Sequence, residues 1–155
     1  MKIGIVTPKL DTSQAGLCIT LNLNKLCEKY NGVEASVFVQ EYGKFVVSPN
    51  FPVMQIRDAW GFNGILISTN IDTTKFLYNI PGPSKKFLYV WELEWMSNNH
   101  THEELSEIYQ NKEIELIARS KHYNTLITNL WKPPIDIMEN FNYEKLIELY
   151  RRYGK

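Results

Sequence analysis

Short apolar runs rich in β-branched residues alternate with helical stretches along the chain, and this alternation restricts the fold more than any other feature. Residues 3–6 form an apolar run that we interpret as a buried strand. Residues 17–30 carry apolar side chains at helical spacing, and residues 35–39 form a second apolar run. Residues 1–40 therefore predict a strand, a loop, a helix and a strand, which is a βαβ unit.

The same alternation continues through the rest of the chain. Further strands are expected at residues 64–69, 86–91, 114–118 and 135–138. Helices are expected at 72–78 with Asp72 as cap, at 101–110 behind a Thr101–Glu104 capping box, at 121–128, and at 143–153 with Asn142 as cap. Residues 45–47 and 53–56 are candidate short strands, and residues 58–60 are ambiguous.

Strands that alternate with helices of this length predict a parallel sheet with helices on both faces. We therefore expect an α/β fold, a Rossmann-like three-layer αβα sandwich with a mainly parallel sheet. The 155 residues match the usual size of one domain, so residues 1–155 are predicted to form a single domain. The apolar fraction of 44% is that of a globular chain and excludes a disordered one.

The overall charge is balanced, with 17 basic and 17 acidic residues. A neutral chain lacks the electrostatic signature of a protein that coats nucleic acid or an anionic membrane. No apolar run is long enough to cross a membrane, and Met1-Lys2 leads directly into a strand rather than a signal peptide. Cys18 and Cys27 lie about 13 Å apart along the expected helix, too far for a disulfide. These features predict a cytoplasmic chain with reduced thiols, and with Cys27 in the core.

Ligands of open parallel sheets bind beyond the carboxyl ends of the strands. Four loops are expected there: residues 7–16, 68–72, 91–100 and 119–122. The first is polar and leads into a helix, whose amino end attracts phosphate or hydroxyl oxygens. It lacks the glycine patterns of nucleotide-binding loops, and its polar residues serve equally well as helix caps. The ligand-binding candidates in it are Asp11, Thr12, Ser13, Gln14 and Gly16.

The segment 91–95 is the most unusual part of the chain, because two indoles and two carboxylates follow a buried strand. Trp91 and Trp95 are candidates for stacking on a sugar ring or a base. Glu92 and Glu94 are the catalytic candidates, since a carboxylate there can deprotonate a hydroxyl nucleophile. The structural alternative is that the indoles belong to the core and the glutamates cap a helix or pair with lysines.

Three further candidates follow the strand at 114–118, where Ser120, Lys121 and His122 open a helix and could bind an anion. A solvated helix start explains them equally well. Asp72 is a ligand-binding candidate that also suits a helix cap. His100 and His102 precede Glu103 and Glu104, but no third ligand is identified, so no metal site is predicted.

Three segments resemble the first domain of GT-B glycosyltransferases. The opening Lys2-Ile3-Gly4-Ile5-Val6, with its loop ending in Gly16, the following helix and the strand at 35–39, is similar to the start of that fold. Residues 114–123, in which a strand meets a serine and enters a helix, resemble a late segment of it. Residues 134–142 are similar to the strand and turn that close that domain. The resemblance covers nearly the whole chain.

GT-B enzymes have two such domains, and the nucleotide-sugar donor is held mainly by the second. The resemblance therefore implies the acceptor-side half only, with Gly16 and its loop facing the cleft and Trp91-Glu92 near the acceptor. It implies transfer of a sugar from a nucleotide-sugar to a hydroxyl acceptor, with no resident cofactor, and a homodimer or a companion chain to complete the cleft. Two other hypotheses remain open: a non-catalytic module that binds a carbohydrate, a nucleotide or a protein, and a different small Rossmann-like enzyme.

Overall fold

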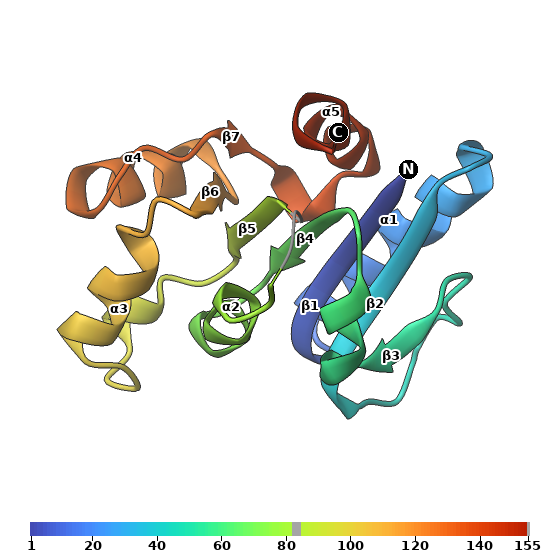
Figure 1. The fold of residues 1–155 in the computed structure, drawn as a ribbon, viewed down its shortest axis with the longest axis horizontal. Coiled ribbons are helices and arrows are strands. Elements are labelled where there is room, and N and C mark those ends of the chain that lie inside the picture. The colour runs from blue at the N-terminus through green and yellow to red at the C-terminus, as the bar shows by residue number, and fades with distance from the viewer. Residues whose placement is uncertain (82–84, 155) are drawn as a thin grey trace.

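A computed structural model describes residues 1–81 and 85–154 and contains a seven-stranded parallel sheet within them (Figure 1). The strands are β1 Lys2–Leu10, β2 Glu34–Tyr42, β3 Val53–Gln55, β4 Ile65–Ser68, β5 Lys85–Val90, β6 Ile114–Ala118 and β7 Asp136–Ile137. The α-helices are α1 Gln14–Lys29, α2 Ile71–Tyr78, α3 His102–Tyr109, α4 Lys121–Leu130 and α5 Tyr143–Tyr153. Three short 3₁₀ helices are η1 Ile56–Gly61, η2 Glu94–Met96 and η3 Glu139–Phe141. The predicted α/β class and Rossmann-like sandwich are confirmed.

The sheet buries apolar side chains on both faces, as a parallel sheet requires. In β4, Ile65 and Ile67 join the cluster beneath α1 and α5, whereas Leu66 joins the cluster beneath η1 and α2. Leu88 and Val90 of β5 join a third cluster with α3 and α4. Helix α5 returns to the amino end of the sheet, where Figure 1 shows it close to the start of β1.

The strand order β3-β2-β1-β4-β5-β6-β7 places a topological switch beside β1. From β1 the chain runs outward through β2 to β3, and it then returns to the other side of β1 as β4. The connections that leave β1 and β4 consequently depart toward opposite faces of the sheet. They open a crevice at the carboxyl ends of these two strands, where open α/β sheets bind their ligands.

The first strand is longer than the sequence indicates. Residues 7–10 were expected to be loop, but they continue β1, with Thr7, Lys9 and Leu10 paired to β2. Leu10 is buried, and its packing stabilises the end of the strand although its neighbours in the sequence are polar. Pro8 has no N–H to donate and is absent from the paired positions. Helix α1 also begins earlier than expected, after Ser13, so Gly16 lies within the helix rather than at the end of a loop.

Two other expectations are wrong. Residues 45–47 do not form a strand, and Phe45 and Val46 are exposed on the connection to β3. Asp72 does not cap α2; Asn70 does, because its extended backbone lets its side chain accept the Thr73 N–H at 2.9 Å. The candidate strand at 53–56 is present as β3 over residues 53–55, and Ile56 and the ambiguous residues 58–60 belong to η1.

The remaining helix starts follow the sequence closely. The Thr101–Glu104 capping box is present at α3, and Asn142 caps α5. Cys18 and Cys27 are free thiols, partly buried against the core on α1, and burial raises the pKa of both. Among the residues that the structure describes, no helix is long and apolar enough to span a membrane.

Candidate functional site at the switch point

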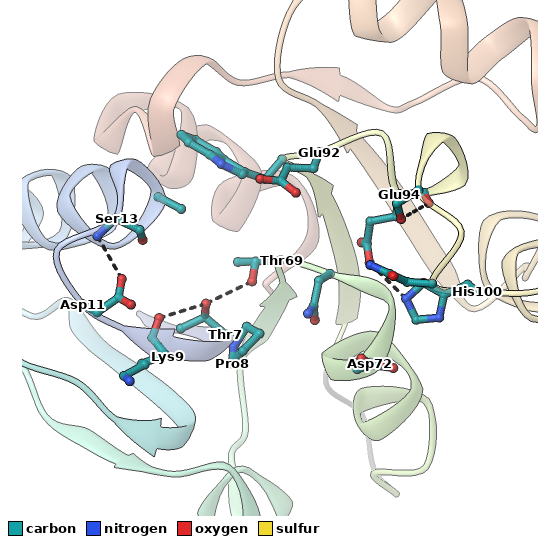
Figure 2. A pocket seen from close by; sticks show the side chains of 15 residues that line it. Thr7, Pro8, Lys9, Asp11, Ser13, Thr69, Asp72, Glu92, Glu94 and His100 are labelled. Atoms are coloured by element: carbon teal, nitrogen blue, oxygen red, sulfur yellow. Dashed lines mark hydrogen bonds and ion pairs between the residues drawn. The ribbon is translucent and has the colours of Figure 1, made fainter.

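A pocket of about 590 Å³ lies at the switch point between β1 and β4 (Figure 2). Its walls come from the end of β1, the start of α1, the β4–α2 turn and the segment after β5. The lining residues are Thr7, Pro8, Lys9, Asp11, Ser13, Ala15, Thr69, Asn70, Asp72, Trp91, Glu92, Glu94, Ser97, Asn99 and His100. Three of the four loops named from the sequence thus meet in one place, and the volume is that of a small-molecule site.

Two buried threonines form the floor of the pocket. The Thr69 hydroxyl donates to Thr7 Oγ1 at 3.1 Å, and the Thr7 hydroxyl donates to the Lys9 carbonyl at 3.5 Å. Figure 2 shows this chain of contacts between the ends of β1 and β4. Since both hydroxyls have partners, the floor is polar and already satisfied before a ligand binds.

The turn before α1 is closed by its own hydrogen bonds. The Ser13 N–H donates to Asp11 Oδ1 at 2.9 Å, and the Gly16 N–H donates to Ser13 Oγ at 3.1 Å. The hydrogen bonds from Ser13 lower the pKa of Asp11. The sequence had suggested that N–H groups of this loop bind a ligand phosphate. Because these two N–H groups already donate within the turn, they are not available to such a ligand.

Gly16 is explained by this turn rather than by the pocket. A Cβ at this position would lie 2.8 Å from the Asp11 backbone nitrogen and closer still to the Asp11 carbonyl oxygen. Since backbone cannot move aside as a flexible side chain can, the turn at 11–13 requires glycine here. The turn places Asp11 and Ser13 on the pocket wall, so Gly16 acts on the site through the backbone.

Glu94 is the most unusual titratable group of the pocket. Its Oε1 accepts the Ile71 N–H at the start of α2 at 2.9 Å, and its Oε2 lies 3.4 Å from His100 Nε2. Its side chain is 15% exposed, and burial raises its pKa to about 7, against the opposing effects of Ile71 and His100. A carboxyl with this pKa is partly ionised at neutral pH and can both release and accept a proton.

His100 connects Glu94 to the helices behind it. Its Nδ1 lies 4.0 Å from Glu104 Oε2, and Glu104 Oε1 accepts from Lys75 Nζ of α2 at 2.7 Å. The Lys75 contact and the Thr101 backbone lower the pKa of Glu104 to about 2. This connected set fixes the position of the Glu94–His100 pair relative to α2 and α3.

The charges around the pocket are mainly negative. Four of its lining residues are carboxylic acids: Asp11, Asp72, Glu92 and Glu94. The facing basic groups are Lys9 and His100, and Lys9 also lies 3.9 Å from Glu41 outside the pocket. Such a pocket repels phosphate and favours ligands that donate hydrogen bonds through hydroxyl or amino groups.

The two indoles named from the sequence lie in different places. Trp91 is buried, stacks against Phe141 at a centroid distance of 5.6 Å, and has the Arg119 guanidinium 3.9 Å from its ring centroid. It reaches the pocket wall beside the exposed Glu92. Trp95 turns toward α3 and packs edge-on against Tyr109 at 5.3 Å. Trp91 therefore has little free face for stacking, and Trp95 lines a neighbouring pocket.

The other candidates lie outside the switch-point pocket. Thr12 borders a shallow hollow with Lys44, and Gln14 Oε1 accepts from Arg119 at 3.5 Å. Ser120 caps α4 by accepting the Tyr123 N–H at 3.2 Å and borders a hollow at Arg119. Lys121 and His122 are exposed on the first turn of α4.

Several lining residues were missed by the sequence reading. Thr7, Pro8 and Lys9 belong to the unexpected extension of β1, and His100 lies six residues after its partner Glu94. Ala15, Thr69, Asn70, Ser97 and Asn99 complete this set. All of these residues lie within the loops 7–16, 68–72 and 91–100 that were expected at the carboxyl edge of the sheet, but none was singled out as a ligand-binding residue. The Glu94–His100 contact has no local sequence signature.

Within residues 1–81 and 85–154, no group of three or more His, Cys, Asp or Glu side chains is arranged to hold a metal ion. The pocket's own side chains offer hydrogen bonding and proton transfer. No protein-family model, curated protein or solved structure was found to match this chain.

Proposed function

We propose that this chain forms the acceptor side of a glycosyltransferase-type active site and binds a hydroxyl-bearing acceptor in the switch-point pocket. The observation that carries the proposal is Glu94, a largely buried carboxyl with a pKa of about 7 at the edge of this pocket. The resemblance of residues 2–6 and 114–123 to GT-B enzymes supports sugar transfer as the reaction.

In the proposed reaction, the ionised Glu94 carboxylate accepts the proton of an acceptor hydroxyl. The hydroxyl oxygen forms a bond to the anomeric carbon of the donor sugar, while the bond from that carbon to the nucleotide phosphate breaks. The phosphate leaves with the bonding electron pair. Glu92 and Asp72, which are exposed at the rim, accept hydrogen bonds from other acceptor hydroxyls.

The donor requires a second surface in this proposal. The acidic lining of the pocket and the internally bonded turn at 11–13 both disfavour a nucleotide phosphate on this side. A second copy of the chain or a companion domain would supply the donor site across the crevice. Sedimentation of the chain with and without nucleotide-sugar tests whether a dimer is the form that binds the donor.

A specific observation favours the second candidate, a non-catalytic binding module. Both carboxylate oxygens of Glu94 have partners, Ile71 N–H and His100, so the group could serve only to hold α2 against the segment after β5. In that case the pocket would bind the same hydroxyl compounds, and Glu94→Gln would leave their affinity unchanged.

Two measurements separate these functions. Titration of ¹⁵N-labelled protein with methyl glycosides and nucleotide-sugars should shift the amide signals of Thr69 and Ile71 with the glycosides. A transfer assay with the same pairs should give product that Glu94→Gln reduces by about 100-fold or more. Glu113→Gln, an exposed glutamate before β6, is the matched control. Absence of glycoside binding would refute the proposal, and glycoside binding without transfer by a form of the chain that also binds the nucleotide-sugar would support the module.

A further inference from the structure

A second, more apolar pocket of about 320 Å³ lies next to the switch-point pocket. Its apolar walls are Trp95, Leu105, Leu130 and Trp131. None of the side chains that line it is a carboxylate, in contrast to the four carboxylates around the switch point. The two pockets therefore favour chemically different groups.

The two pockets share a wall. Ser97 and His100 line both of them, and Figure 2 shows His100 beside Glu94 at one end of the switch-point pocket. His100 Nε2 lies 3.4 Å from Glu94 Oε2, and its side chain is only 11% exposed. A compound with a hydroxyl at Glu94 consequently has the second pocket within reach on the other side of a single imidazole ring.

The aromatic wall is held in place by packing. Tyr109 stacks on Trp131 at a centroid distance of 5.3 Å, and His102 stacks on Trp131 at 5.5 Å. Trp95 meets both Tyr109 and Trp131 edge-on. Such a wall is ordered before a ligand arrives, which lowers the entropic cost of binding a flat apolar group.

One apolar side chain of this pocket is largely exposed to solvent. Leu130, at the end of α4, lines the pocket and is 54% exposed. Covering this side chain with an apolar group of a ligand releases water from it and favours binding.

We propose that the ligand of the switch-point pocket extends past His100 into this second pocket and carries a planar, apolar group, such as an aromatic ring, attached to its hydroxyl-bearing part. The hydroxyl-bearing part lies among the carboxylates, and the ring lies against Trp95, Trp131 and Leu130. This inference rests on the proposed function, because it assigns a class of acceptor to the same site.

Pairs of methyl and phenyl β-glycosides of the same sugars test the extension by calorimetry. The phenyl compound should bind about tenfold more tightly than its methyl partner. Leu130→Ala should remove most of this gain without changing the affinity for the methyl compound. Leu21→Ala, which removes another partly exposed leucine from α1, should leave both affinities unchanged and serves as the matched control.

The NMR signals of the ¹⁵N-labelled protein show where each part of the ligand lies. The phenyl glycoside should shift the indole signal of Trp131 together with the Thr69 and Ile71 amides, whereas the exposed Trp60 should remain unchanged. Equal affinities within a methyl–phenyl pair would overturn the extension while leaving the proposed function intact. A shift of Trp131 without the two amides would also overturn it, and absence of binding by every compound would overturn both proposals.

Discussion

Single residues at the switch point owe their properties to neighbours that are distant in the sequence. Glu94 has an ordinary carboxyl group, and burial against the start of α2 raises its pKa to about 7. Asp11 lies in the same pocket, yet hydrogen bonds from Ser13 lower its pKa. Two carboxylic acids with opposite shifts give one pocket both an ionised group and a group that exchanges protons near neutral pH.

Glu94→Gln should change how stability depends on pH. Glu94 binds its proton more tightly in the folded state, so its protonated form stabilises the fold fully below pH 4.5, the pKa of an ordinary glutamate. This contribution is lost as pH rises toward 7. The glutamine keeps an oxygen for the Ile71 N–H but does not ionise. Relative to Glu94→Gln, the native chain should therefore lose up to about 3 kcal/mol of unfolding free energy between pH 4.5 and 7.5.

Urea unfolding at several pH values measures this difference. Glu113→Gln provides the control, because this exposed glutamate has the same chemistry without the burial, and its curve should parallel that of the native chain. Parallel curves for the native chain and Glu94→Gln would contradict the raised pKa.

Gly16→Ala should destabilise the chain by about 1–3 kcal/mol, because the added methyl group meets the backbone of Asp11. Gly61→Ala should change the free energy of unfolding by less than about 0.5 kcal/mol, since a Cβ there has no neighbour within 4 Å. Chemical denaturation of both variants checks the pair. Equal changes in the free energy of unfolding for the two variants would show that the turn at 11–13 moves to accommodate the methyl group.

At the scale of elements, polar caps determine where the helices begin at the carboxyl edge of the sheet. Ser13, Asn70 and Ser120 each accept a backbone N–H of the first helical turn. Each of these caps follows a strand, and Ser13 and Asn70 also line the switch-point pocket, whereas Ser120 borders a separate hollow. Several residues that suit ligand binding by type are therefore already engaged in capping.

Ser120→Ala should cost about 1 kcal/mol of unfolding free energy, because the Tyr123 N–H loses its acceptor at the start of α4. The affinity for methyl glycosides should not change, since Ser120 lies outside the switch-point pocket. Thr128→Ala, at an exposed position later in α4, is the control and should have an effect under about 0.5 kcal/mol. A loss of glycoside affinity in Ser120→Ala would assign this residue to the ligand site instead.

At the scale of the whole molecule, one sheet connects the apolar clusters on its two faces. Ile67 of β4 packs beneath α1 and α5, and Ile114 of β6 packs on the opposite face with α3. β4 pairs with β5 and β5 pairs with β6, so one hydrogen-bonded ladder links the strands that carry these two residues. Loss of packing on one face should therefore destabilise the entire sheet.

Ile67→Val and Ile114→Val should each lower the free energy of unfolding by about 1 kcal/mol, since each removes one buried methylene group. Both variants should keep a single unfolding transition, coincident by tryptophan fluorescence and far-ultraviolet circular dichroism. The exposed Val46→Ala should leave the transition in place. Two separate unfolding transitions, with each variant shifting the midpoint of only one of them, would contradict the prediction of a single domain.

The fold class followed from the sequence because it depends on local patterns. Apolar runs such as residues 65–67 and 116–118 are too short for core helices, and their alternation with amphipathic helices leaves a parallel sheet as the solution. The caps at Thr101 and Asn142 were equally predictable, since a cap and its partner lie within three residues of each other. The edge at which the pocket lies was predictable because the chain direction of each strand determines where its carboxyl end lies.

Only the tertiary structure decided which side chains meet at that edge. Thr7 and Thr69 are 62 residues apart, and their contact depends on the pairing of β1 with β4. The raised pKa of Glu94 depends on burial against α2, and the separation of Trp91 from Trp95 depends on the turn after β5. Local patterns therefore determined the elements and their order. Strand pairing and burial determined the switch-point pocket, the charge of its lining and the apolar pocket beside it.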